Sequence, residues 1–385
     1  EFWGRMSWIP RASEPLSLEA DGRDTADALT LISREPVGSS ARARHGARSG
    51  WEADHLDPSS HAGSPVASLA FSWDGGVLAS RRLGGPLLVW DARRGELLDG
   101  LKLGPFESDV HCPFAFSPST PARLVVGVNA PLPGREHPYA VVLWDRDVVA
   151  SEDSPNVFAI RWTPAPIRLL CLPARGSAVL FVDEEDTACD LVRGSFFGAL
   201  VNRSQPAYEC GSVTRLGYRA EALGVSPDGR YRATGDDRGV VRLYREGFGE
   251  RVFAERAHGS QVTAVAFAGA RYFATAGRDR EVVLWDVKNR GVLKRLDEHR
   301  QAVRWVLFSE DRDTMVSADV SGEIKVWDCG RRLALRETIQ ADGFSLTALA
   351  MSPDGRLIAS ATDRNRIQLW RRARSRRRRD DEDDE

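Results

Sequence analysis

Residues 272–286 read YFATAGRDREVVLWD, two short runs rich in apolar residues that flank a polar turn and end in Trp-Asp. Short runs that alternate with a period of two are typical of β-strands. The same ending, or a related one, occurs elsewhere at 88–91, 142–145, 242–245, 325–328, 368–371 and, in degenerate form, 179–183. The aromatic anchors at 244, 285, 327 and 370 are 41, 42 and 43 residues apart, so the second half of the chain is an internal repeat.

Turn signals precede these endings, most clearly as Ser-Pro-Asp-Gly-Arg at 226–230 and 352–356. Proline presets φ for a turn, aspartate bonds its own backbone, and glycine accepts a positive φ. Related stretches are assigned to the same place in other repeats, at 71–75, 116–118, 163–166 and 308–311. Each repeat is therefore predicted to contain hairpins of short strands.

These repeats resemble those of the WD-repeat β-propeller family, in which a blade has four strands and ~40–45 residues. The resemblance runs from about residue 50 to 371 and is weakest between 146 and 222. It implies an all-β fold, a single seven-bladed propeller over 48–371 with flexible charged termini. Residues 1–47 are expected to be a flexible arm, and 372–385 an Arg-rich and then acidic tail.

The resemblance also implies a buried hydrogen-bonded tetrad of His, Ser or Thr, Asp and Trp in a complete blade. The assigned residues are His258, Thr275, Asp279 and Trp285 in blade five, His299, Ser317 and Trp327 in blade six, and His61, Ser80 and Trp90 in blade one. In blade six Ser321 stands at the Asp position, so that tetrad is expected to be incomplete. The histidines are interpreted as structural, with no metal ligand and no catalytic residue among them.

The last blade lacks a convincing outer strand, because residues 371–385 are mostly arginine and then acidic. A propeller has to cover its sheet edges, so the missing strand should come from the N-terminal side. The repeat period places it near 51–55, with 28–32 as the alternative. Two insertions are expected, at 129–138 within blade two and at about 184–218 between blades three and four.

Composition restricts the function classes. The 53 basic and 55 acidic side chains nearly cancel, which argues against a whole-molecule electrostatic grip on nucleic acid. No apolar run approaches the ~18 residues of a membrane span. The five cysteines form no CxxC pair, which argues against a disulfide framework or zinc site and favours an intracellular location, cytoplasmic or nuclear. No phosphate-binding, metalloprotease or nucleophile-elbow motif occurs, so neither an enzyme nor a cofactor is expected.

The leading interpretation is a non-catalytic protein-interaction scaffold or adaptor that presents propeller loops to other proteins within a larger complex. Arginines expected in equivalent turns are assigned to a partner-binding rim: Arg81, Arg82, Arg175, Arg278 and Arg364. Two alternatives stay open. The rim and the seven arginines of 371–379 could contact RNA or phosphate in a ribonucleoprotein, and that cluster could also be a nuclear-import signal. Residues 273–288 are similar to a box with which some family members dock on cullin-type ubiquitin ligases as substrate receptors.

Overall fold

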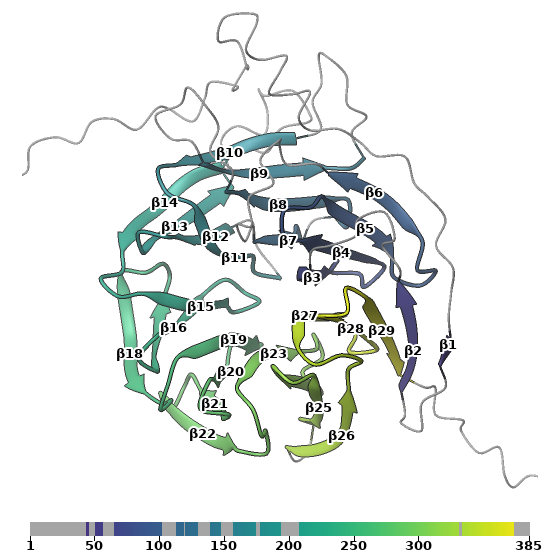
Figure 1. Ribbon diagram of the computed structural model, residues 1–385. Coiled ribbons are helices and arrows are strands. Elements are labelled where there is room, and N and C mark those ends of the chain that lie inside the picture. The colour runs from purple at the N-terminus through teal and green to yellow at the C-terminus, as the bar shows by residue number, and fades with distance from the viewer. Residues whose placement is uncertain are drawn as a thin grey trace, which may run out of the picture.

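The computed structural model describes residues 44–45, 51–56, 65–101, 113–118, 120–129, 139–147, 157–174, 178–193, 208–330 and 333–372. Within these ranges every regular element is a strand, and the strands form seven sheets around one axis (Figure 1). The expectation of an all-β, seven-bladed propeller is therefore confirmed. No helix in these ranges is long and apolar enough to cross a membrane.

Blades one to three use the first strands of the ring. Their bounds are, in blade one, β3 Val66–Phe71, β4 Val77–Arg82, β5 Leu87–Asp91 and β6 Leu97–Leu101; in blade two, β7 Phe114–Phe116, β8 Arg123–Val128, β9 Tyr139–Asp145 and β10 Val157–Thr163; and in blade three, β11 Ile167–Cys171, β12 Ala178–Asp183, β13 Thr187–Arg193 and β14 Tyr208–Arg215.

Blades four to seven complete the ring. Their bounds are, in blade four, β15 Ala220–Val225, β16 Tyr231–Asp236, β17 Val240–Arg245 and β18 Glu250–Arg256; in blade five, β19 Val262–Ala268, β20 Tyr272–Gly277, β21 Val282–Asp286 and β22 Gly291–Leu296; in blade six, β23 Val303–Phe308, β24 Thr314–Asp319, β25 Glu323–Asp328 and β26 Ala334–Gln340; and in blade seven, β27 Leu346–Met351, β28 Leu357–Thr362 and β29 Ile367–Arg372, with β2 Trp51–Leu56 and β1 Arg44–His45 outermost.

The core lies between neighbouring blades as well as within them. One cluster joins Ala233 and Leu243 of blade four to Phe273 and Trp285 of blade five. The Trp285 ring stacks on Phe273 with centroids 5.4 Å apart. Such aromatic pairs contribute about 0.5–1.5 kcal/mol beyond the area they bury. Neighbouring blades therefore share a core, and packing between blades stabilises the ring.

Closure is made by the predicted N-terminal strand. β2 pairs antiparallel with β29 in an unbroken register from Trp51 opposite Arg372 to Leu56 opposite Ile367. Leu56 is 3% exposed and packs in the cluster that contains Trp90. The prediction of an outer strand near 51–55 is confirmed, and the alternative at 28–32 lies outside the described residues. β1 pairs with β2 and falls within the segment that was expected to be a flexible arm.

Blade three differs from the expectation. The anchor strand was placed at 179–183, but this segment is β12, the second strand, and the third and fourth are β13 and β14. The insertion expected between blades at 184–218 therefore lies mostly inside blade three, and residues 194–207 are outside the described ranges. The stretch 163–166 joins β10 of blade two to β11 and is not a hairpin turn. β13 has no aromatic residue, so Phe181 of the preceding strand β12 was assigned as the anchor of this blade.

The turn between β23 and β24 stores backbone strain. Gly75, Gly229 and Gly355 hold positive φ angles of 67°, 73° and 65° in equivalent turns, whereas blade six has Arg312 at φ 68°. A left-handed conformation costs a residue with a Cβ roughly 1–2 kcal/mol, and the extra unfolded-state entropy of glycine offsets roughly 0.5–1 kcal/mol of that.

Arg312→Gly should therefore raise the free energy of unfolding by about 0.5–1 kcal/mol. Urea unfolding of the full chain measures this difference. A destabilised variant would mean that contacts of the Arg312 side chain near Gly269 outweigh the strain.

Candidate interaction surface

The blade-five tetrad forms one hydrogen-bonded chain. His258 Nδ1 lies 3.0 Å from Asp279 Oδ1, and its Nε2 lies 2.8 Å from Thr275 Oγ1. Trp285 Nε1 donates to the same Thr275 oxygen at 3.0 Å. The backbone N–H of Gly259 also donates to Asp279, at 2.8 Å. These hydrogen bonds hold the segment that enters blade five against the second and third strands of that blade. The four side chains therefore have a structural role.

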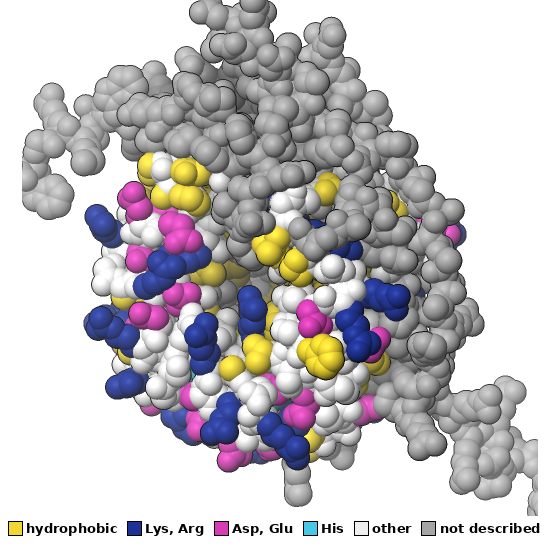
Figure 2. Space-filling view, in the orientation of Figure 1, with side chains coloured by type: hydrophobic (Ala, Val, Ile, Leu, Met, Phe, Trp, Pro, Cys, Tyr) yellow, Lys and Arg dark blue, Asp and Glu magenta, His cyan; other side chains and the backbone are white. Residues whose placement is uncertain are grey.

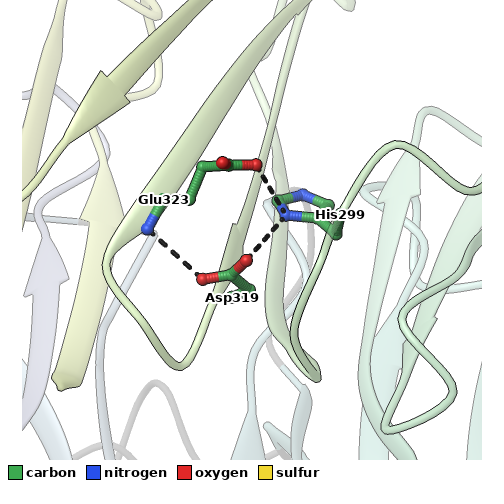
Figure 3. Close-up of side chains that lie close together, drawn as sticks. All are labelled: His299, Asp319 and Glu323. Carbon is green, nitrogen blue, oxygen red and sulfur yellow. Dashed lines mark hydrogen bonds and ion pairs between the residues drawn. The ribbon is translucent and has the colours of Figure 1, made fainter.

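Blade six builds the same chain with a different aspartate. His299 Nδ1 lies 3.4 Å from Asp319 Oδ2 (Figure 3). The other ring nitrogen, Nε2, lies 2.7 Å from Ser317 Oγ. Trp327 Nε1 donates to Ser317 at 2.9 Å. Ser321, which was placed at the Asp position, instead donates its hydroxyl to Asp319 at 2.6 Å. The expectation that this tetrad is incomplete is wrong.

Blades five and six supply the aspartate of the tetrad from different positions in the sequence. Gly277 and Asp319 each stand two residues after the Thr or Ser of their tetrad. A Cβ at Gly277 would lie 2.3 Å from Asp279 Oδ1 and 2.5 Å from a nitrogen of His258. Glycine is thus required where the aspartate comes from the turn, and in blade six the side chain at that same position supplies the carboxylate.

Blades one, four and seven keep parts of the network. Trp90 Nε1 donates to Ser80 and Trp370 Nε1 donates to Ser360, each at 2.8 Å, while His61 lies outside the described residues. In blade four the Tyr218 hydroxyl links Thr234 and Tyr244, at 2.7 and 2.8 Å. Burial raises the pKa of Tyr218, so this substitute for the histidine stays neutral. The sequence interpretation did not identify Tyr218, because it precedes its strand as an ordinary loop residue.

Three side chains around the blade-six tetrad have the ligand atoms of a cation site. His299, Asp319 and Glu323 each offer a ligand atom, and these atoms lie within 4.8 Å of one another (Figure 3). The ammonium group of Lys325 lies 2.5 Å from Glu323 Oε1 and supplies the positive charge. A lysine of the chain itself thus offsets the charge of one of the two carboxylates.

Acid should weaken the blade-five tetrad. Burial alone would raise the pKa of Asp279, but hydrogen bonds from His258 and backbone N–H groups, together with the charge of His258, outweigh burial and lower it. A carboxylate with a lowered folded pKa stabilises the fold above its unfolded pKa of about 3.9, and that stability is lost as pH falls through the folded value. Asp279→Asn should therefore be less stable than the natural chain at pH 7, and the difference should shrink below about pH 4.

Urea unfolding of both proteins at the two pH values checks this expectation. A difference that stays constant with pH would show that the charge of Asp279 does not stabilise the fold.

The predicted rim arginines do not form one surface. Arg81 and Arg82 are only 8% and 6% exposed, and Arg82 donates to the carbonyl of Asn365 in blade seven at 3.0 Å. Burial lowers the pKa of Arg81 to about 10. Their assignment to an exposed rim is wrong, because they end strand β4 and pack against neighbouring turns.

The other three rim residues separate as well. Arg175 lies outside the described residues, in the segment between β11 and β12 that corresponds to the Pro-Asp-Gly turns of other blades. Arg278 and Arg364 are exposed in the β20–β21 and β28–β29 turns. Arg364 forms an ion pair with Asp342 at 2.9 Å. Among the described residues, Arg278 has no carboxylate within ion-pair distance.

A ring of β-bulges marks the same end of the propeller. In six of the seven inner strands the register shifts at the first residues of the strand. The residue at each shift, here called the bulge ring, is Ala67, Arg168, Glu221, Thr263, Arg304 or Thr347. Bulges redirect side chains and are frequent beside binding sites. The ring lies where the joins between blades and the turns of Arg278 and Arg364 meet.

Charges are mixed over this molecule. Figure 2 shows basic and acidic side chains intermixed over the described part of one face. In the bulge ring Arg168 pairs with Glu184 at 3.3 Å and with Asp186, and Arg219 pairs with Glu221 at 2.8 Å. On the face that Figure 2 shows, the described residues therefore form no continuous basic surface, and local groups of charge are what a partner would meet there.

Comparison with known proteins agrees with this architecture. The family model "WD domain, G-beta repeat" matches residues 249–286, 290–328 and 335–371. Each match starts at or near an outer strand and ends with the third strand of the following blade. A chain in the crystal structure of the mitotic checkpoint complex is similar with a TM-score of 0.61 and 17% identity, covering 80% of this chain and 86% of that one.

Curated relatives match over shorter stretches. The chain is 26% identical over 152 residues to Target of rapamycin complex subunit wat1 of Schizosaccharomyces pombe, covering 39% of this chain and 48% of that protein. It is 31% identical over 127 residues to Small ribosomal subunit protein RACK1 of Glycine max, with 28% and 39% covered. It is 22% identical over 98 residues to human Pre-mRNA-processing factor 17, with 26% and 17% covered. The match thus spans less than half the length of each of these relatives.

Proposed function

Since this chain is a seven-bladed WD-repeat β-propeller, we propose that it is a non-catalytic scaffold that serves as a subunit of a larger protein complex. The observation that carries the proposal is the structural role of the histidines and aspartates in the tetrads of blades five and six. His258, Asp279, His299 and Asp319 are all held in structural tetrads. What the described surface offers instead is exposed loop residues on a rigid ring, a typical arrangement for binding.

The names of the relatives support the proposal. Target of rapamycin complex subunit wat1 and Small ribosomal subunit protein RACK1 are both named as parts of assemblies. The ubiquitin-ligase alternative loses support, because Thr275, Asp279 and Trp285 of the similar box form the blade-five tetrad and a good repeat accounts for them. The RNA alternative is not favoured by the intermixed charges of the described surface.

The native size of the tagged full-length chain tests the proposal. We expect it to sediment from a gentle extract as part of an assembly larger than the monomer, with at least one partner in fixed proportion. Sedimentation of the whole population as free monomer at low and physiological salt would contradict a role as a complex subunit.

A further inference from the structure

Two arginines at the bulge-ring end belong to neighbouring blades. Arg304 is the bulge residue of β23, and Arg278 lies in the β20–β21 turn of the preceding blade. Both are exposed, and neither has a carboxylate within ion-pair distance among the described residues. Arg168, the other arginine of the bulge ring, is paired with two acidic side chains. The pair in blades five and six therefore carries positive charge with no ion-pair partner among the described residues.

The two arginines flank the start of β19: the Arg278 N–H donates to the carbonyl of Gln261 at 2.9 Å, and the Thr263 hydroxyl donates at 2.5 Å to the carbonyl of Val303, which precedes Arg304. Although the Arg304 side chain is exposed overall, neighbouring protein atoms partly remove water from its guanidinium, and this desolvation, followed by the charge of Arg278, lowers its pKa. Asp279 is next to Arg278 in sequence, but its oxygens are bonded to His258 and to the N–H groups of Gly259 and Glu281. Among the residues that the structure describes, no carboxylate lies within ion-pair distance of either arginine. An anion placed near both would offset their charge, since a planar guanidinium binds carboxylate or phosphate through paired hydrogen bonds.

An exposed aromatic ring lies at the same end. Phe344, in the join from β26 to β27, is 85% exposed, the highest value among the large apolar side chains of the described chain. Its backbone is anchored, because its N–H donates to Asp363 at 3.1 Å, and the Arg364 guanidinium lies 5.9 Å from the ring centroid. Aromatic and arginine side chains are the usual anchors of protein interfaces.

A protein fits this surface better than a nucleic acid. Glu281, Asp342 and Asp363 lie in the same set of turns and joins, and Glu281 and Asp342 already pair with Arg295 and Arg364. A continuous phosphate backbone would meet these carboxylates, whereas a discrete acidic side chain can reach only Arg278 and Arg304, which form no ion pair with a described residue.

We propose that the bulge-ring end of blades five to seven docks an acidic segment of a partner protein. A carboxylate of that segment binds Arg278 and Arg304, and an apolar side chain beside it packs on Phe344. The inference rests on the proposed scaffold function and adds the place and the chemistry of the contact.

The test uses the full-length chain and a fluorescent synthetic peptide of alternating Glu and Leu, with binding followed by anisotropy. We expect salt-sensitive binding that Arg278→Glu with Arg304→Glu weakens about tenfold or more. Phe344→Ala should weaken it by a smaller factor. The matched control, Arg230→Glu with Arg356→Glu, makes the same charge change in the Pro-Asp-Gly turns at the opposite end and should leave binding within about twofold. Thermal unfolding checks that each variant is folded.

Four outcomes would overturn the inference. The first is no peptide binding by the natural chain, and the second is an equal loss of peptide binding in the control pair. The third is peptide binding that appears only after deletion of the acidic residues 380–385, and the fourth is that Arg278→Glu with Arg304→Glu abolishes binding of single-stranded RNA but leaves peptide binding unchanged. The third would make the tail of the chain the occupant, and the fourth would make the surface a nucleic-acid site. If the Arg278 and Arg304 variant keeps its native assembly while the natural chain fails to bind peptide, the scaffold function stands and only the docking site is wrong.

Discussion

Removing residues 1–56 should lower the free energy of unfolding by about 5 kcal/mol, and removing residues 1–43 should leave it nearly unchanged. The longer deletion takes away β2, which pairs with β29 over six residues, and Leu56, which is buried against the core of blades one and seven. Loss of a buried leucine alone costs about 2–5 kcal/mol, and each lost hydrogen bond adds about 0.5–1.5 kcal/mol. The exposed edge of β29 would also invite pairing between molecules.

Urea unfolding and light scattering of the two truncated chains measure these effects. The shorter deletion is the control, since it removes chain of similar composition but keeps β1 and β2. Equal stability of both truncated chains would show that the N-terminal strand does not close the ring.

Asp319→Ala should cost about 3 kcal/mol or more, whereas Ser321→Ala should cost about 1 kcal/mol. Asp319 accepts hydrogen bonds from His299, from the N–H groups of Ser321 and Glu323, and from the Ser321 hydroxyl. Its replacement leaves a buried histidine and a turn without their acceptor, and removing one partner of a buried charged group is strongly destabilising. Ser321→Ala removes one of several donors to an acceptor that stays bonded.

Chemical denaturation of the two single variants gives both values, with Asp279→Ala of blade five as the reference for a lost tetrad aspartate. A Ser321→Ala cost equal to or above that of Asp319→Ala would return the aspartate role in blade six to the turn position.

Sequence was informative where the repeat is regular. The spacing of Tyr244, Trp285, Trp327 and Trp370 gave the blades of the second half, and counting back from Trp90 located β2. It failed in blade three, because β13 carries no aromatic anchor and Phe181 of β12 was counted in its place. A sequence pattern assigns strands to a blade by their aromatic anchors, so the strands are assigned wrongly in a blade that lacks an anchor.

The interaction surface was only partly predictable. Arg278 was identified from its turn, but Arg81 and Arg82 were assigned to the same rim although neighbouring blades bury them. Arg304 was missed because it reads as a residue inside a strand, and only the register shift shows that the backbone bulges there. Exposure and charge compensation depend on contacts between blades, which spacing along the chain does not report. The signal for Asp319 was present as the exchange of Gly277 for aspartate two residues after the tetrad hydroxyl.

The most direct test of the account is site-specific photo-crosslinking in the native assembly. A photoreactive amino acid is placed at Phe344, at the bulge-ring end, or at Arg356, in a Pro-Asp-Gly turn at the opposite end. We expect a stoichiometric partner to be crosslinked from position 344 through an acidic segment, with little product from position 356. Crosslinking of that partner from position 356 and not from 344 would contradict the claim that this end of the propeller is the docking surface.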